Sequence, residues 1–397
     1  MSSRCPVHSD FDPLVPETFD SAHAQYAELR ARCPVAHSDA FGGFWALTKY
    51  DDVVTALSDV STYVTSVQNV VPKVAFTGRR PPLHLDPPEH TPYRAALNPL
   101  LTPERVARLE PVVRRFAVEL LAPMIASGQA DICEAFGGHL PVRVFGHWMN
   151  LPPHLESALA QAGPAFIRAV QSAQENVMRD TSLALYDMAR QLIALRKQSK
   201  LDPDKDPTSA LLAARKDGEP LPDEMVVGMV RQVLVVGIVA PMVMVGTMAV
   251  HLSRHLELQQ QLRNDLSLVP AAVEEFLRLY TPYRGFARTA THDVEFRGRT
   301  IEKDEPIALL YASANRDEDV FPDAASFQLH RPNIKEHLAF GRGPHYCAGA
   351  ALARVELQVA LEELLKRTKH FEVNGPVVMT PFPEIGPWCV PVRFEAA

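Results

Sequence analysis

Apolar residues recur at three- and four-residue intervals between residues 92 and 218, most clearly in Leu100–Ile125 and Glu156–Lys197. This spacing places apolar side chains on one face of a helix. Pro152 and the polar stretch Lys200–Pro207 interrupt the pattern, because proline and clustered polar residues favour turns. Further helices are predicted over three other segments: Ala22–Arg32, Tyr50–Ser58 and Ala350–Lys366.

Short strands are predicted where apolar residues lie between turn residues. Asp39 and Gly43 flank the start of Phe44–Thr48, which indicates a small hairpin. The other predicted strands follow Arg278: Val294–Phe296, Thr300–Ile301, Pro306–Leu310, and short strands near Phe371 and in Val390–Phe394. Thr62–Pro82 has no clear period and is predicted to be a long loop, which is usually functional or disordered. The predicted fold class is mainly α with small β-sheets.

The longest apolar run is Val233–Leu252, which contains no Asp, Glu, Lys or Arg. It is long enough to span a bilayer. However, Gly237, Pro241 and Gly246 interrupt it, and no second span accompanies it. A helix that is apolar on every side is also typical of the centre of a large protein. We therefore expect a buried central helix and no membrane association.

Composition fits a large globular chain of 397 residues, with 47% apolar and 22% charged residues. No Ser/Gly run, long charge block or fixed repeat divides it, so we expect one domain over residues 1–397. The net charge of −7 without a basic stripe argues against a nucleic-acid partner. The start of the chain lacks the apolar core of a signal peptide.

The cysteines are odd in number, and no pair has CxxC spacing; they are Cys5, Cys33, Cys133, Cys347 and Cys389. This usage argues against a disulfide framework or a structural zinc site. A reducing cytoplasm is the expected location. His251 and His255 are four apart on a predicted helix, but no glutamate accompanies them as a zinc hydrolase would need.

The clearest chemical signal is the segment FGRGPHYCAG, residues 340–349, directly before the last predicted helix. Its glycines allow a tight turn and close approach of the backbone to a flat ligand. Cys347 stands at the entry to that helix, where free N–H groups and the helix dipole lower a thiol pKa. A thiolate there can bind haem iron, and its electron donation favours O–O bond cleavage.

This segment resembles the haem-binding loop of the cytochrome P450 family at every fixed position. The resemblance runs from near residue 10 to the last residue and implies the cytochrome P450 fold, with haem b between a distal central helix and the proximal cysteine loop. It implies that Cys347 is the axial ligand, that His345 donates a hydrogen bond to a haem propionate, and that Phe340 shields the sulfur. Gly341 and Gly349 are the loop glycines expected beside the cofactor.

Further motifs appear in the order that the resemblance implies. Glu275 and Arg278 form an ExxR motif one helical turn apart. Arg331 would complete a Glu–Arg–Arg triad that braces the fold beside the haem loop, a role suited to the planar guanidinium group.

The segment DPPEHTPYR, residues 86–94, resembles the one that leads into the family's helix over one haem edge. His90 and Arg94 are four apart, so they would share one helix face. Both would bind haem propionates, since charge-assisted hydrogen bonds need cationic donors. Arg288 matches a third propionate-binding position.

The central helix departs from the family pattern of a small residue, glycine, any residue, an acid and an alcohol. Here Val239 occupies the acid position and Ala240 the alcohol position. An acid–alcohol pair relays protons to iron-bound oxygen, and neither valine nor alanine can do so. Pro241 lacks an N–H and frees a carbonyl one turn back, near Gly237. That carbonyl, or a water bound to it, would replace the missing hydroxyl.

Three functions therefore stay open. The preferred prediction is a monooxygenase that inserts one oxygen atom from O2 into a small apolar substrate, by hydroxylation or O-/N-dealkylation. The second is a peroxygenase that uses H2O2. The third is a haem-thiolate protein that inserts no oxygen and acts as a sensor or isomerase.

The partners and the pocket follow from the same resemblance. A monooxygenase would take electrons from a ferredoxin and its reductase, docked near Arg342 and Lys335, or from a fused reductase outside this chain. Besides Val239 and Ala240, the predicted substrate contacts are largely apolar: Val236, Arg284, Phe286 and Phe382. Arg284 is predicted either to bind a substrate carboxylate or, as the preferred interpretation, to face solvent.

Overall fold

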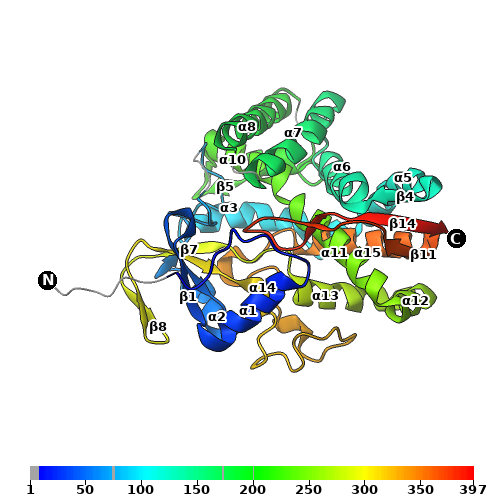
Figure 1. Cartoon of the computed structure of the whole chain (residues 1–397). Helices are drawn as coiled ribbons and strands as arrows, with labels where there is room; N and C mark the ends of the chain where they lie inside the picture. The colour runs from blue at the N-terminus through cyan, green and yellow to red at the C-terminus, as the bar shows by residue number, and fades with distance from the viewer. Residues whose placement is uncertain (1–8, 74–76, 172–173, 200) are drawn as a thin grey trace.

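The computed structural model describes residues 9–73, 77–171, 174–199 and 201–397. It is mainly helical, with α6, α7 and α8 grouped on one side, strands β1 and β7 gathered on another, and α11 packed beside α13 and α15 (Figure 1). The helices are α1 Ser21–Arg32, α2 Tyr50–Ser58, α3 His90–Leu97, α4 Pro103–Ala107, α5 Glu110–Ser127, α6 His139–Trp148, α7 Pro153–Gln171, α8 Glu175–Gln198, α9 Pro207–Ala213, α10 Asp223–Val236, α11 Val239–Arg254, α12 Leu256–Asn264, α13 Val269–Tyr280, α14 Tyr311–Ala314 and α15 Ala350–Arg367.

The strands are short and form small sheets. They are β1 Val35–Ser38, β2 Phe44–Leu47, β3 Tyr63–Val64, β4 Gln129–Asp131, β5 Arg215–Lys216, β6 Glu219–Pro220, β7 Ala287–Ala290, β8 Val294–Phe296, β9 Arg299–Ile301, β10 Pro306–Leu309, β11 Thr368–Val373, β12 Val378–Met379, β13 Pro387–Cys389 and β14 Pro391–Ala396. The largest sheet has the order β1-β2-β10-β7-β3, in which only β2 and β10 pair in parallel. The predicted hairpin is confirmed, with Val35 opposite Leu47.

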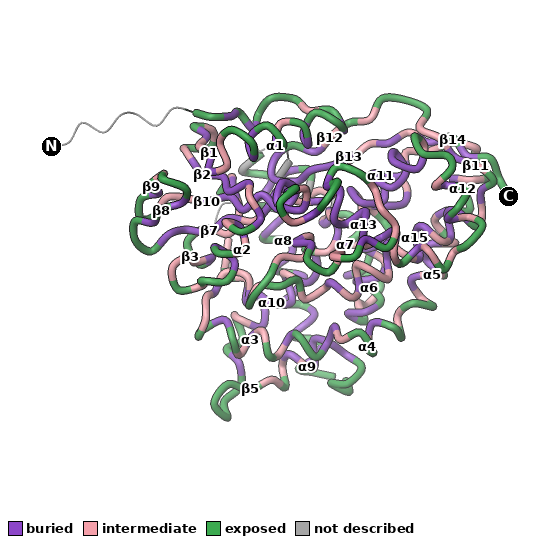
Figure 2. Tube along the Cα trace, turned by 90° about the horizontal axis from the view of Figure 1, so that it is seen from below, coloured by how far each residue is buried: buried purple, intermediate pink, exposed green. Residues whose placement is uncertain are grey.

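The predicted central helix is buried but divided. The helical stretch Asp223–Arg254 is long and apolar enough to cross a membrane, yet 78% of its most apolar window is buried. Figure 2 shows buried chain along α11 and α13 in the middle of the molecule. The stretch is therefore a core helix, and it is divided at Gly237 and Ile238 into α10 and α11. The hydrogen bond from Met242 N–H to the Ile238 carbonyl is long, at 3.4 Å.

The helix predicted over Leu100–Ile125 is wrong in detail, because the chain breaks within it. A 3-10 turn ends at Leu101, and Thr102 then caps α4 by accepting a hydrogen bond from the Arg105 N–H. Pro103 takes the first position of α4, where a missing N–H costs nothing. Helix α5 begins only at Glu110. Residues that cap a helix, here Thr102 and Pro103, can therefore start a new helix within a segment whose apolar spacing predicts one continuous helix.

Candidate active site

The glycine-rich segment forms a tight loop that delivers Cys347 to the start of α15. The Cys347 N–H donates a hydrogen bond to the Phe340 carbonyl at 2.9 Å, which closes the loop. Gly343 has a φ of 72°, and a Cβ on it would lie 2.9 Å from the Leu57 carbonyl oxygen. Both the left-handed backbone and the close approach exclude a side chain at this position.

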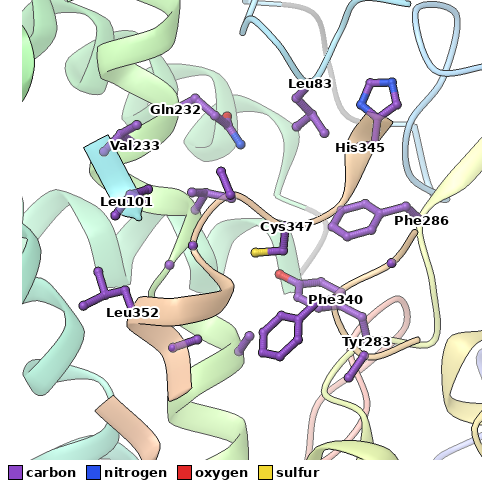
Figure 3. A pocket seen from close by; sticks show the side chains of 18 of the residues that line it. Leu83, Leu101, Gln232, Val233, Tyr283, Phe286, Phe340, His345, Cys347 and Leu352 are labelled. Carbon is purple, nitrogen blue, oxygen red and sulfur yellow. The ribbon is translucent and has the colours of Figure 1, made fainter. Parts of the chain in front are cut away.

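The sulfur of Cys347 points into a cavity deep in the protein (Figure 3). Cys347 is one of the residues that line this cavity, and its side chain is accessible from it. Burial raises the pKa of the Cys347 thiol. A hydrogen bond from the Gly349 backbone and the positive charges of Arg94 and Arg354 lower this pKa, but burial has the larger effect. A thiolate in this place needs a further positive charge, and a bound metal ion supplies one.

One edge of the cavity carries donors that lack acceptors. Arg288 lines the cavity and is 3% exposed; its Nη1 donates to the Ala287 carbonyl, and its Nε has no partner among the described residues. Arg94 and His345 also line this edge. The His90 ring lies 4.5 Å from the His345 ring, and the His90 Nε2 likewise has no partner there. Unpaired buried donors are costly, and the two carboxylates of a haem fit them.

The two histidines at this edge have lowered pKa values. Burial, and then the charge of Arg94, lowers the pKa of His90 to about 4. Burial, and then Arg288, lowers the pKa of His345 to about 3. Without a bound carboxylate both rings are therefore neutral at pH 7, and a carboxylate placed beside them would raise both pKa values.

The three triad residues meet in the core. Arg278 donates two hydrogen bonds to the Glu275 carboxylate at 2.8 and 2.7 Å, and Arg331 Nε donates to it at 3.1 Å. All three side chains are at most 3% exposed. The remaining guanidinium donors bind backbone carbonyls of residues 315–326, including those of Ala324 and Ser326. The triad thus fastens α13 to the chain that leads into the cysteine loop.

Comparisons with known proteins match this arrangement. Residues 163–386 match the model of the family described as cytochrome P450. The chain belongs to the cytochrome P450 family. It is 32% identical over 374 residues to cytochrome P450 109 of Bacillus spizizenii, covering 92% of this chain and 87% of that protein.

Two other relatives extend the match. The mycinamicin IV hydroxylase/epoxidase of Micromonospora griseorubida is 33% identical over 364 residues, covering 89% of each chain. The solved structure of cytochrome P450 CYP109Q5 from Chondromyces apiculatus has a TM-score of 0.88 at 29% identity and covers 98% of each chain. This protein is therefore a P450 monooxygenase with a haem-thiolate cofactor and the P450 fold.

The distal wall of this P450 comes from the break between α10 and α11. Val236, Gly237, Ala240 and Pro241 line the cavity, so the alcohol position faces it. Val239, at the acid position, is buried at 7% exposure and is not part of the described cavity wall. Its expected substrate contact is therefore not present.

Gly237 is required by packing. A Cβ there would lie 2.2 Å from the Phe145 ring, which also lines the cavity. Pro241 has no N–H, so the Gly237 carbonyl lacks its usual donor four residues on. Gly237 lines the cavity, and the replacement of the missing hydroxyl by its carbonyl stays a prediction.

Two predicted pocket residues lie elsewhere. Val236 and Phe286 line the cavity, but Arg284 and Phe382 are not among its described lining residues. Arg284 is only 1% exposed and donates to both oxygens of Glu17 at 2.8 and 2.6 Å. Both interpretations of Arg284 are wrong, because a carboxylate from the N-terminal segment already neutralises it. Phe382 packs against Phe44 instead, with ring centres 5.6 Å apart.

Sequence reasoning missed Glu356, which lines the cavity from α15. It is 2% exposed, and its Oε1 has no partner among the described residues. Burial raises the pKa of this carboxyl to about 8. The sequence could have indicated this position, because Glu356 stands four residues after Leu352 and is therefore a charged residue on the apolar face of the last helix.

Proposed function

We propose that this P450 inserts one oxygen atom from O2 into a C–H bond of a small, mostly apolar organic molecule, by hydroxylation or O-/N-dealkylation. The observation that carries the proposal is the apolar wall around the Cys347 sulfur. Its apolar lining residues include Leu83, Leu97, Leu101, Phe145, Met229, Val233, Val236, Ala240, Met244, Phe286 and Leu352. Such a wall binds apolar substrates and excludes water.

The haem, when bound, supplies the reductive activation of O2 and the insertion of one oxygen atom. Cys347 supplies the thiolate, and Arg94, Arg288, His345 and His90 hold the cofactor's carboxylates. The apolar side chains of α10 and α11 would orient the substrate on the face of the haem opposite Cys347.

Proton delivery must differ from that of an acid–alcohol pair. The free carbonyl oxygen of Gly237 accepts a hydrogen bond from a water molecule and so holds that water beside Ala240. Glu356 is the one carboxyl among the described lining residues, and its raised pKa keeps it protonated at pH 7. Because Glu356 lies on α15, behind the Cys347 loop, a bound haem would separate it from the distal wall. The water at the Gly237 carbonyl, and not Glu356, is therefore the proposed proton carrier on the distal side.

A peroxygenase is the second candidate, and the pair Val239–Ala240 is the observation that favours it. Hydrogen peroxide brings both oxygen atoms, two electrons and two protons. A relay of protons from solvent is then unnecessary. The missing hydroxyl would do no harm in that reaction.

We also propose that electrons come from a ferredoxin and its reductase. Relatives of this chain are bacterial P450 proteins. Arg342, in the cysteine loop, has a 49% exposed side chain, and Lys335 is also exposed. These cations suit an acidic electron carrier on the side of the Cys347 loop.

Turnover with two electron sources tests the proposal. A ligand is first selected by its shift of the haem absorbance, and product is then measured with ferredoxin, reductase and NADPH, or with H2O2 alone. Ala240→Thr is expected to raise product formed per electron in the ferredoxin system by about two-fold or more. Ala240→Val is the matched control, because valine has the shape of threonine without its hydroxyl. If neither source yields product from a bound ligand, oxygen insertion is the wrong reaction.

A further inference from the structure

Arg231 is a fully buried arginine without a carboxylate partner. Among the described residues the buried arginines are Arg30, Arg196, Arg231, Arg278, Arg284, Arg288 and Arg331. All but two of them pair with a carboxylate. The two exceptions are Arg288, which faces the site of the haem carboxylates, and Arg231. A buried charge without a counter-charge is rare and costly, so Arg231 needs an anion from elsewhere.

The contacts of Arg231 are all with neutral groups. Its Nη2 donates to the Ser182 Oγ at 2.8 Å, and its Nε has no partner among the described residues. Its guanidinium carbon lies 4.9 Å from the ring centre of Phe166 and 5.5 Å from that of Tyr186. Aromatic faces attract a cation, but they leave its full charge in place.

A second arginine adds to this positive charge. Arg80 lies close enough to Arg231 for its charge to lower the pKa of Arg231. Arg231 in turn lies close enough to His84 to lower the pKa of that histidine. Burial, followed by the charge of Arg80, lowers the pKa of Arg231 to about 9. Burial, followed by Arg80 and Arg231, lowers the pKa of His84 to about 3. At pH 7 the cluster therefore holds two arginine cations and a neutral histidine.

This cluster lies directly behind one wall of the substrate cavity. Pro81, Pro82 and Leu83 stand between Arg80 and His84 in the chain, and all three line the cavity. Gln232, next to Arg231 on α10, lines it too, and its side-chain amide is seen at the wall in Figure 3. The Gln232 Oε1 accepts a hydrogen bond from the Arg231 Nη1 at 3.4 Å. That contact directs the amide N–H groups of Gln232 away from the arginine.

We propose that the substrate of this P450 carries a carboxylate, which binds at the cavity end formed by Gln232 and the segment 81–83. Gln232 donates to the carboxylate, and Arg231 and Arg80 stabilise its charge from behind, through a region of low dielectric constant. The apolar remainder of the substrate extends towards Cys347. This inference rests on the proposed function in so far as that function places a substrate in the cavity.

Matched carboxylate and amide ligands test the proposal without turnover. The holoprotein is titrated with decanoate and decanamide, and with 4-butylbenzoate and 4-butylbenzamide, and binding is measured from the haem absorbance. In the unsubstituted protein each carboxylate is expected to bind about tenfold more tightly than its amide. Arg231→Gln and Gln232→Leu are expected to reduce this preference to about two-fold or less, while Arg231→Lys retains most of it.

Arg79→Gln is the matched control, because Arg79 precedes Arg80 but its side chain is 57% exposed and pairs with Glu89. It is expected to leave the preference unchanged. Gln232→Leu keeps the buried arginine, so it decides the question even if Arg231→Gln does not fold. Ligands that leave the haem spectrum unchanged are compared by melting temperature, which a bound carboxylate raises more than its amide does.

The proposal is overturned if both amides bind as tightly as their carboxylates, or if Gln232→Leu and Arg231→Gln keep the full preference. Because neither readout needs electrons or oxygen, a failure of monooxygenation leaves the result interpretable. Conversely, a chain that oxidises only neutral compounds and shows no preference for carboxylates refutes this inference while leaving the proposed function intact.

Discussion

Glu356 shows how a single buried carboxyl changes the response of this P450 to pH. Its pKa lies near 8 in the folded chain, compared with 4.5 for an ordinary glutamate, because burial disfavours the charged form. Between these two values the folded protein keeps a proton that the unfolded chain releases. The free energy of unfolding therefore falls as pH rises from about 4.5 to about 8.

Glu356→Gln is expected to remove this contribution. The variant should gain stability relative to the unsubstituted chain as pH rises, by several kcal/mol at most, because glutamine needs no proton. Urea unfolding of the holoprotein at about pH 5.5 and about pH 8 measures the difference. Glu295→Gln, at an exposed position, serves as control. Equal pH slopes in the Glu356→Gln variant and the unsubstituted chain would show that Glu356 titrates normally.

Arg288 is the second residue with a testable role, the binding of the haem. Its Nε is unpaired and it lies on the cavity wall, and we propose that it binds a carboxylate of the haem. Arg288→Gln is expected to release haem to apomyoglobin about tenfold faster, since a charge-assisted bond becomes a neutral one. The carbon monoxide band should keep its thiolate position, because Cys347 is unchanged. An unaltered rate of haem loss would exclude Arg288 as a cofactor ligand; Arg297→Gln, at a 43% exposed arginine, is the control.

At the scale of elements, the break between α10 and α11 positions the distal wall. It combines a proline at 241 with the contact between Gly237 and the Phe145 ring of α6. A proline inside an apolar helix would otherwise cost about 3 kcal/mol. Because α11 begins at Val239, Pro241 lies in its first turn, where a missing N–H removes no helical hydrogen bond.

Gly237→Ala is expected to destabilise the protein by about 1–3 kcal/mol, because the new methyl group overlaps the Phe145 ring. Chemical denaturation measures the loss. The double variant Gly237→Ala with Phe145→Leu should be less destabilised than the sum of the two single changes, since the smaller side chain makes room. Simple additivity of the two changes would mean that the helix backbone, and not the ring contact, requires glycine here.

At the scale of the whole molecule, the proposed routes for electrons and substrate lie on different sides of the cavity. The cations Arg342 and Lys335 lie near the Cys347 loop, and the cluster around Arg231 lies behind the wall formed by α10 and residues 81–83. Changes to one route should therefore leave the other intact.

Arg342→Glu is expected to raise the KM for ferredoxin about tenfold, because a like charge then opposes the acidic carrier. Steady-state kinetics at two salt concentrations measure this, and the effect should shrink at high salt. Ligand titrations followed by haem absorbance are expected to be unchanged. If Arg342→Glu leaves the KM for ferredoxin unchanged, ferredoxin docks on a face of the protein other than that of the Cys347 loop.

Local sequence determined much of this protein. The helices α1, α2 and α15 follow from the periodicity of neighbouring residues. The segment around Cys347, the ExxR motif and the absence of an acid–alcohol pair are also local in sequence, and the resemblance to the cytochrome P450 family gave them their meaning. The boundaries inside 100–125 were missed because Thr102 and Pro103 act as a cap within an apolar period.

Only the tertiary structure decided which charges are paired. Arg284 meets Glu17 across 267 positions of the chain, Arg231 meets no described carboxylate, and Glu356 meets a cavity. In the sequence these residues are simply charged, because a one-dimensional pattern records charge but not the partner that folding brings near. Whether a buried charge is neutralised depends on that partner. The proposed preference of the cavity for carboxylate substrates therefore depends on the tertiary structure and cannot be read from the sequence.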